Sequence, residues 1–355
     1  MAEPIANPLA DRSAPYGARQ RAVLDDAGSA AARAEIASWQ GYAPTPLRLL
    51  DGIGCMVGYK DEAGRFGLGS FKALGGAYAV QRQVALAGGR KVTVACATDG
   101  NHGRSVAWGA ARFGAGCVIY VHETVSSGRI AAIAAYGAEV RVVPGTYDDA
   151  VRQAAADAAA NGWIVVSDTS YPGYTDIPRD VMQGYTVMAA EALEQWPGPP
   201  PTHCFLQAGV GGMAAAVVSV LWRRFAGARP LVVTVEPERA ACVVESVRRG
   251  RAASVGGGLD TLMAGLACGE TSLIAWELLE QGADFAMTVS DDQAVAAMRL
   301  LAARGIVAGE SAVAGLAGFL ESLAAGRLGL GPDSRVLLFG SEGDTDPDLY
   351  RRLVA

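Results

Sequence analysis

The chain has 355 residues, of which 51% are hydrophobic and 19% are charged, and its formal net charge is −6. This length exceeds the usual size of one hydrophobic core and predicts two lobes or one large α/β unit. An acidic chain is poorly suited to the phosphate backbone of nucleic acid, which needs clustered Lys and Arg, so we expect no nucleic-acid partner.

The cysteines and the N-terminus exclude further classes. Six cysteines occur without a CxxC pair and only three histidines accompany them, so we expect neither a metal site nor a disulfide framework. The first residues, MAEPIANPLADRSAP, carry Asp, Glu and Pro where a secretory signal needs a basic and then an apolar region. Arg, Asp or Gly interrupts each apolar run before it reaches membrane-spanning length. We therefore expect a cytoplasmic protein with no membrane partner.

Short apolar runs rich in β-branched residues alternate with Ala-rich segments of helical spacing. The predicted strands cover residues 91–98, 116–122, 139–145, 163–169, 202–209, 230–237 and 335–343. The predicted helices cover residues 101–114, 129–137, 148–162, 181–196 and 211–227. Strand followed by helix, repeated, predicts an α/β fold with a mainly parallel sheet flanked by helices on both faces. The Pro-rich segment 194–203 predicts a surface connector at a lobe boundary.

Lys72 lies among small and apolar residues in the segment GLGSFKALGG, residues 67–76. A lysine at the start of an apolar helix most often extends its ammonium group to solvent. Burial, by contrast, would lower the pKa of Lys72 and leave a neutral amine free to form a Schiff base with a carbonyl cofactor.

Two loops that follow predicted strands have the sequences of ligand sites, and ligands of parallel sheets bind at such strand ends. The loop at 97–105, ATDGNHGRS, carries Asp99, Asn101 and His102, and its alternative interpretation is a turn with a helix cap. The loop at 207–216, QAGVGGMAAA, has glycines whose N–H groups can converge on a phosphate at a helix N-terminus. Close packing of helix against sheet would explain those glycines nearly as well.

A third loop, LLFGSEGDTDPDLY at 337–350, is acidic. Its carboxylates suit a hard cation, but a solvated turn before the last helix explains most of them better. One lysine, a Gly-rich phosphate loop and polar loops at strand ends together favour pyridoxal 5'-phosphate as the cofactor.

Seven segments in chain order resemble the fold type II pyridoxal phosphate enzymes, the tryptophan synthase β and threonine dehydratase group, and within them the diaminopropionate ammonia-lyase family. These segments are residues 65–80, 97–115, 167–185, 207–217, 261–270, 305–316 and 341–350. Ordinary threonine dehydratases do not share the DGNHGR and EGDTDP blocks. The resemblance implies two lobes, each with a mainly parallel sheet flanked by helices. It places a large cofactor-binding domain at residues 1–85 and 193–355, and a smaller mobile domain at 86–192.

The resemblance also assigns roles to residues. Lys72 would hold the cofactor and take or return the α-proton. Asp99 and Asp168 match two aspartates near the substrate, one of which accepts the proton of the D-isomer, so that one site can deprotonate either enantiomer. Asn101 would contact the phenolic oxygen of the cofactor, and Ser341 its pyridine nitrogen. The phosphate would bind to the loop formed by Gly209, Val210, Gly211, Gly212 and Met213. For His102 we expect a structural role.

The implied reaction is α,β-elimination of 2,3-diaminopropionate, or of a related β-substituted amino acid, to pyruvate and ammonia by a homodimeric enzyme. Tyr171 and Pro172 replace an aromatic residue and an acid that are typical of the family near the substrate. An acid that would favour an ammonium leaving group is therefore missing at that place, and β-replacement or racemisation is an alternative outcome. A second alternative is a non-catalytic protein that binds its ligand through the cofactor pocket.

Overall fold

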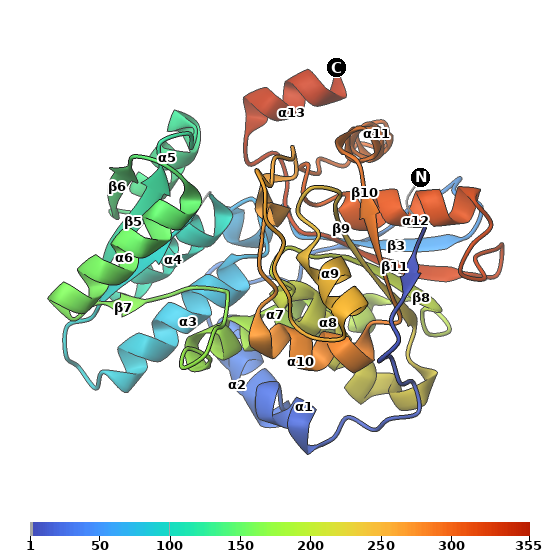
Figure 1. The fold of residues 1–355 in the computed structure, drawn as a ribbon, viewed down its shortest axis with the longest axis horizontal. Coiled ribbons are helices and arrows are strands. Elements are labelled where there is room, and N and C mark those ends of the chain that lie inside the picture. The colour runs from blue at the N-terminus through green and yellow to red at the C-terminus, as the bar shows by residue number, and fades with distance from the viewer. Residues whose placement is uncertain (1–2, 99) are drawn as a thin grey trace.

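The computed structural model describes residues 3–98 and 100–355 and contains two separate sheets, drawn at opposite sides of Figure 1. The seven-stranded sheet has the order β1-β10-β9-β8-β11-β3-β2. Its five inner strands are parallel, and the edge strands β1 and β2 are antiparallel to their neighbours. The strands are β1 (Ile5–Ala6), β2 (Leu47–Leu49), β3 (Met56–Asp61), β8 (His203–Gln207), β9 (Leu231–Pro237), β10 (Phe285–Val289) and β11 (Arg335–Gly340).

The second sheet has four parallel strands in the order β6-β5-β4-β7. They are β4 (Thr93–Ala97), β5 (Gly116–His122), β6 (Glu139–Val143) and β7 (Ile164–Val165). All four strands lie within the segment 86–192, whereas the strands of the larger sheet lie outside it.

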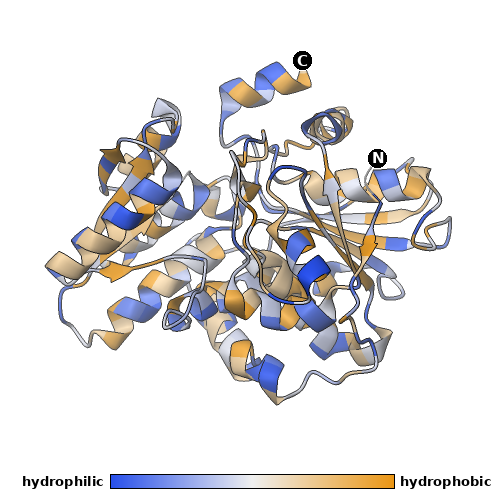
Figure 2. Ribbon diagram, in the orientation of Figure 1, coloured by the Kyte–Doolittle hydropathy of each residue, from blue (hydrophilic) through white to orange (hydrophobic). Residues whose placement is uncertain are grey.

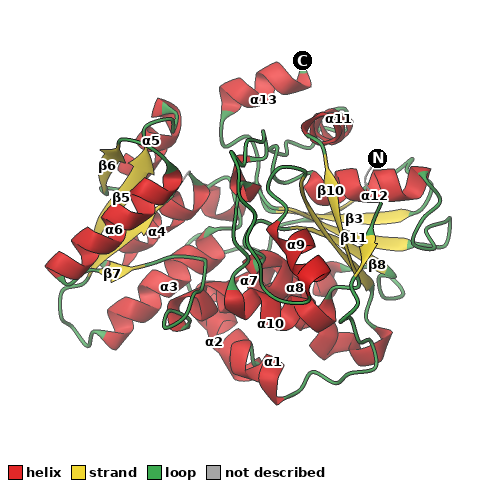
Figure 3. Ribbon diagram, viewed as in Figure 1, coloured by secondary structure: helices red, strands yellow, loops and turns green. Residues whose placement is uncertain are grey.

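Thirteen α-helices are present in the described residues (Figure 3). They are α1 (Ala18–Val23), α2 (Asp26–Ala37), α3 (Ala73–Leu86), α4 (Asn101–Phe113), α5 (Ser127–Ala134), α6 (Tyr147–Asn161), α7 (Asp176–Gln195), α8 (Gly212–Phe225), α9 (Cys242–Arg249), α10 (Leu273–Gly282), α11 (Asp291–Ala302), α12 (Ala314–Ala324) and α13 (Pro347–Val354). Three short 3₁₀ helices cover Arg65–Gly67, Ala226–Ala228 and Ala264–Leu266.

Alternating residues of the larger sheet enter two different cores, as expected for strands covered on both faces. In β11, Leu337 and Phe339 pack in one core with residues of α7, α8 and α10, whereas Val336 and Leu338 pack in the other with residues of α11 and α12. Figure 2 shows orange concentrated on the strands, while the outer helices α6 and α13 carry bands of blue. Burial of these apolar side chains is the main favourable term in the stability of the fold.

All seven predicted strands and all five predicted helices are present, with shifts of a few residues at their ends. The prediction missed β1, β2, β3 and β10, together with α1, α2 and the four helices from α9 to α12. Strand β3 was missed because its sequence, MVGYKD, contains Gly58 and the charged Lys60 and Asp61. Lys60 is nevertheless completely buried, because Glu191, which is distant in sequence, neutralises its charge.

Helix α3 crosses two other helices at glycines, and these crossings fix the backbone next to Lys72. A Cβ atom on Gly75 would lie 2.4 Å from the Tyr185 ring of α7, and one on Gly76 would lie 2.0 Å from Ser105 Oγ of α4. On the opposing helices, a Cβ on Gly184 would clash with Leu74 O and one on Gly109 with Ala77 Cα. Only hydrogen fits at these four positions, so α3 packs backbone against backbone with both neighbours.

None of the helices in residues 3–98 and 100–355 combines the length and apolar character needed to cross a membrane.

Candidate active site

Lys72 and Asp168 form an ion pair at the start of α3. Lys72 is the N-cap residue of α3, and Asp168 lies in the loop between β7 and α7. Lys72 Nζ donates to Asp168 Oδ2 over 2.5 Å, and each side chain is 20% exposed. The ammonium group also lies 5.4 Å from the centre of the Phe71 ring and 5.8 Å from that of Tyr185. The lysine therefore points into a half-closed, partly aromatic site and not into bulk solvent.

The pair shifts the pKa of both groups. Burial acts to lower the pKa of Lys72, but the adjacent Asp168 carboxylate outweighs it and raises this pKa above its usual value. Burial likewise acts to raise the pKa of Asp168, but the Lys72 ammonium outweighs it and holds this pKa well below its usual value. The lowered Lys72 pKa that we expected from burial alone is therefore wrong for this arrangement, because sequence reasoning did not include the counter-ion.

His102, in the first turn of α4, lies next to this pair. Its Nε2–H donates to the Val166 carbonyl oxygen over 3.0 Å, and its Nδ1 lies 3.8 Å from Asp168 Oδ2. Burial lowers the pKa of His102, so its ring is neutral near pH 7. The bond to Val166 fixes the ring beside Asp168 and fits the structural role that we expected.

Asn101, the first residue of α4, contacts the larger sheet through Glu342. The amide Nδ2 of Asn101 donates to Glu342 Oε2, and Glu342 is 5% exposed. Glu342 belongs to the loop after β11, and the backbone of this loop pairs with the segment that precedes Lys72. Phe71 N donates to Ser341 O over 3.0 Å, and Gly343 N donates to Gly69 O over 2.9 Å.

The Gly-rich loop connects the end of β8 to the start of α8. Gly211 has a φ of 93°, a left-handed conformation that favours glycine. The carbonyl oxygens of Gly209 and Val210 accept from Cys242 Sγ and Ser272 N, at 3.4 and 2.9 Å. The N–H groups of Gly209, Val210 and Gly211, by contrast, donate to no acceptor within the described residues. Such N–H groups at the start of a helix are suited to an anion.

The Gly-rich loop also lies close to the ion pair. A Cβ atom on Gly212 would lie 3.8 Å from Asp168 O, and one on Gly209 would lie 2.9 Å from Cys268 Sγ. The loop is therefore adjacent to the loop that carries Asp168, and its glycines leave no room for a side chain at Gly209.

Ser341 follows β11 and is 5% exposed. Its Oγ accepts a hydrogen bond of 3.0 Å from Gln207 Nε2, at the end of the adjacent strand β8. Because the hydroxyl already accepts from Gln207, its own proton is available for a neutral acceptor such as a pyridine nitrogen.

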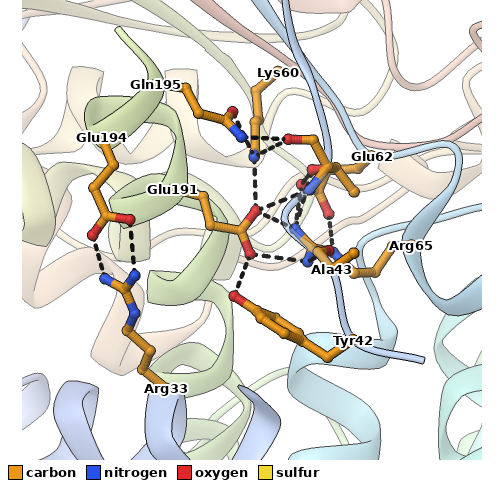
Figure 4. A network of polar contacts seen from close by, with 10 residues as sticks. Arg33, Tyr42, Ala43, Lys60, Glu62, Arg65, Glu191, Glu194 and Gln195 are labelled. Carbon is orange, nitrogen blue, oxygen red and sulfur yellow. Dashed lines mark hydrogen bonds and ion pairs between the residues drawn. The ribbon is translucent and has the colours of Figure 1, made fainter. Parts of the chain in front are cut away.

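A buried ionic network holds the segment that leads to Lys72 (Figure 4). Glu191 of α7 accepts from Lys60 Nζ and from Arg65 Nη2, each over 2.7 Å, and Arg65 also donates to Glu62 over 2.8 Å. All four side chains are at most 1% exposed. Two cations thus balance two anions, which removes the cost of an unpaired buried charge. The network fixes Arg65, seven residues before Lys72, against α7.

Most of the site residues that we predicted therefore lie together. Lys72 contacts Asp168, and Gly212 lies near the loop that carries Asp168. Ser341 is joined to the Lys72 segment by a backbone hydrogen bond from Phe71, and Asn101 is joined to the same loop by its contact with Glu342. Asp99 lies outside the described residues. In the acidic loop Glu342 is buried, whereas Asp344 is exposed and Asp346 caps α13 by accepting from Leu349 N, so the solvated turn that we expected for most of these acids excludes Glu342.

Sequence reasoning assigned no role to Tyr185, Arg65 or Glu310. Tyr185 belongs to a segment that resembles the family, but the residues around it in the sequence do not indicate a role at the site. Arg65 and Glu310 acquire their partners, Glu191 and Arg129, only in the folded chain. For Glu342, its place directly after a buried strand was the available signal.

These groups fit a phosphorylated pyridine aldehyde. A primary amine suits the carbonyl carbon, free N–H groups at a helix N-terminus suit the phosphate, and a hydroxyl suits the ring nitrogen.

Comparison with known proteins indicates the same cofactor. Residues 38–342 match the family model described as pyridoxal-phosphate dependent enzyme. The chain is 40% identical over 350 residues to a diaminopropionate ammonia-lyase of Escherichia coli (strain K12), with 88% of each chain covered. The crystal structure of selenomethionine-incorporated holo diaminopropionate ammonia lyase from Escherichia coli superposes with a TM-score of 0.92 at 36% identity, covering 100% of this chain and 96% of that one. A structure of that enzyme in complex with an aminoacrylate-PLP azomethine reaction intermediate has a TM-score of 0.91 at 36% identity, covering 100% and 97%.

Proposed function

Because the chain belongs to the pyridoxal-phosphate dependent enzymes, and within them to the diaminopropionate ammonia-lyase family, we propose that it converts 2,3-diaminopropionate and water into pyruvate and two molecules of ammonia. The observation that carries this proposal is the Lys72–Asp168 pair beside a loop of free N–H groups. The pair offers an amine and a base, and the adjacent loop offers N–H groups suited to an anion.

The residues that would hold pyridoxal 5'-phosphate are those whose geometry fits it. Lys72 would attach the cofactor through its amine, Gly209 to Met213 would bind the phosphate, Ser341 would donate to the ring nitrogen, and Asn101 would contact the phenolic oxygen. When bound, this cofactor supplies an electron sink for the carbanion that forms at the α-carbon. The protein supplies orientation and proton transfer.

Asp168 is suited to proton transfer because its basicity depends on Lys72. The full ammonium charge of Lys72 keeps Asp168 ionised but weakly basic. When the Lys72 nitrogen no longer carries a full positive charge, its effect on Asp168 weakens. Burial then raises the pKa of Asp168 toward the range of a general base. We propose that Lys72 and Asp168, with Asp99, hold and move the α-proton of the two substrate enantiomers.

The test is to supply purified protein and pyridoxal 5'-phosphate with D- or L-2,3-diaminopropionate and to measure pyruvate and ammonia. Pyruvate and ammonia at a ratio of one to two, from a reaction with no second substrate, would support the proposal. Pyruvate that appears only with a second nucleophile, or a product that keeps the amino group, would indicate β-replacement or racemisation. Binding without turnover would indicate a non-catalytic protein. Lys72→Ala is the control, and turnover that survives it would argue against the assigned amine.

We also propose a homodimer in the cytoplasm, with a smaller mobile domain at residues 86–192 and a larger domain at 1–85 and 193–355. The family resemblance supports the dimer, and the confinement of the four-stranded sheet to 86–192 supports the division. Light scattering that gives twice the mass of one chain would support the dimer, and the mass of a single chain would contradict it.

A further inference from the structure

Glu342 is a buried carboxylate at the candidate active site for which the reaction above has no use. It directly follows Ser341, the candidate contact of the ring nitrogen, and it touches Asn101, the candidate contact of the phenolic oxygen. Its two carboxylate oxygens have different partners. Oε2 accepts from Asn101 Nδ2, and Oε1 accepts from Ser311 N over 3.2 Å. The carboxylate is therefore fixed at both oxygens.

The contact with Glu342 fixes which way the Asn101 amide faces. The NH₂ group of Asn101 points toward Glu342, and the carboxylate, when ionised, can only accept this hydrogen bond. The side-chain amide of Asn101 rotates easily, so a single hydrogen bond to a neutral partner would hold it loosely. A charge-assisted hydrogen bond is stronger and restricts this rotation more. One N–H of Asn101 is used by Glu342, which leaves the second N–H for another acceptor.

Among the described residues, the acid Glu310 and the cation Arg129 lie near Glu342. Burial raises the pKa of Glu342, and Arg129 together with the Ser311 and Asn101 hydrogen bonds acts in the opposite direction. The second acid, Glu310, is 4% exposed, and its Oε1 accepts from Arg129 Nη2 over 3.4 Å. Arg129 belongs to α5, which packs beside the four-stranded sheet, whereas Glu310 lies between α11 and α12 beside the larger sheet. The cation that offsets these two carboxylates thus comes from the opposite side of the site.

We propose that Glu342 is the positioning residue of Asn101. It holds the amide so that the second N–H meets the phenolic oxygen of the cofactor, and the Ser311 N–H and the charge of Arg129 stabilise the carboxylate. The proposal rests on the proposed function for the identity of the cofactor, but not on the identity of the amino-acid substrate.

A double-mutant cycle on cofactor binding tests this role. The dissociation constant and the visible absorbance of bound pyridoxal 5'-phosphate are measured for the wild type, Asn101→Ala, Glu342→Ala and the double variant. A residue that acts only through Asn101 has no further effect once the amide is gone. We expect each single variant to weaken binding roughly tenfold and the double variant to match Asn101→Ala within about twofold. Single losses that multiply to roughly a hundredfold in the double variant would overturn the proposal.

Glu342→Gln keeps an acceptor of the same shape and serves if the alanine variant does not fold. We expect it to weaken cofactor binding less than Glu342→Ala and to shift the absorbance in the same direction as Asn101→Ala. Suppose that Asn101→Ala changes both the absorbance and the affinity, but Glu342→Gln leaves both equal to those of the wild type. This outcome would also overturn the proposal. Glu139→Gln, an exposed acid of β6 paired with Arg141, is the matched control for charge removal.

These readouts separate the inference from the proposed function. If the wild type binds the cofactor but releases no pyruvate from diaminopropionate, the proposed substrate is wrong, and the cycle on cofactor binding still tests Glu342. If the wild type binds no pyridoxal 5'-phosphate, both proposals are wrong.

Discussion

The Lys72 ammonium and the Asp168 carboxylate lie 2.5 Å apart although 96 residues separate them in the chain. Each group holds the other in its charged form, yet attachment of a carbonyl cofactor requires a neutral amine. Asp168 therefore sets the pH at which Lys72 can react.

Asp168→Asn is expected to move cofactor attachment to lower pH. Without the carboxylate, burial is the largest remaining influence and lowers the pKa of Lys72, so the amine is neutral over a wider range. Borohydride trapping of the cofactor as a function of pH measures this shift. The same variant should lose at least about a hundredfold in turnover, because it removes a proton acceptor. A trapping profile identical to that of the wild type would contradict the assignment.

The two aspartates are expected to differ in the enantiomer that they serve. Following the family resemblance, Asp99→Asn should reduce turnover of D-diaminopropionate more than turnover of the L-isomer. Rates of pyruvate release from both isomers, compared between Asp99→Asn and Asp168→Asn, measure this difference. Equal losses with both isomers in the Asp99 variant would count against a stereospecific base at that position.

Gly209→Ala is expected to weaken cofactor binding roughly tenfold, because the added Cβ would lie 2.9 Å from Cys268 Sγ and displace the phosphate loop. Gly128→Ala is the matched control. Gly128 lies in α5, and a Cβ there meets no heavy atom within 4 Å, so the helix should gain about 0.5 to 1 kcal/mol with no change in cofactor affinity. A titration of each variant with pyridoxal 5'-phosphate, followed by absorbance, gives the comparison. Equal affinities of the two variants for the cofactor would show that the loop does not bind the phosphate.

Glu191→Gln and Glu194→Gln compare a buried with an exposed ion pair on one helix. Glu191 faces Lys60 and Arg65 with no exposure, so its neutralisation should cost about 3 kcal/mol or more in the free energy of unfolding. Glu194 pairs with Arg33 at the surface, where the side chains are 54% and 43% exposed, and its loss should cost less than about 1 kcal/mol. Urea unfolding of both variants measures the two costs. Similar costs would show that the network in Figure 4 is not buried in solution.

His102 is expected to make stability fall in mild acid. Burial lowers its pKa below the unfolded value of 6.5, so between these two values the unfolded chain binds a proton that the native ring does not. This contribution is complete above pH 6.5 and is lost as the pH falls toward the native pKa, by about 1.4 kcal/mol per unit at most. Burial raises the pKa of Glu236 to about 8, which acts in the opposite direction. The measurement is therefore the difference between wild type and His102→Gln in urea unfolding at about pH 7.5 and about pH 5.5. A difference that does not change with pH would refute the depressed pKa.

The sequence predicted those parts of the fold whose signal is local. Apolar β-branched runs and Ala-rich helices lead to the right strands and helices because burial and helical spacing act within about ten residues. The Gly-rich loop and the polar loops could be located because ligands of parallel sheets bind at the strand ends. Family resemblance, and not spacing, distinguished Asp168 and Ser341 from ordinary loop residues.

The parts that could not be predicted depend on partners far along the chain. In the sequence, the charge of Lys60 makes β3 resemble a surface segment. In the fold, Glu191 neutralises this charge, and Lys60 is buried. The pKa of Lys72 is raised and not lowered because Asp168 is its neighbour. Glu342 looked like one of several acids in a turn, and its burial beside Asn101 follows only from the way the two sheets meet.

The glycine crossings of α3 have a mechanical consequence. With Gly76 against Ser105 and Gly109 against Ala77, helices α3 and α4 interlock too closely to slide along each other without backbone clashes. Lys72 caps the first of these helices and Asn101 begins the second. A motion of α4 that left α3 behind would therefore break this packing, so the amine and the amide keep their separation.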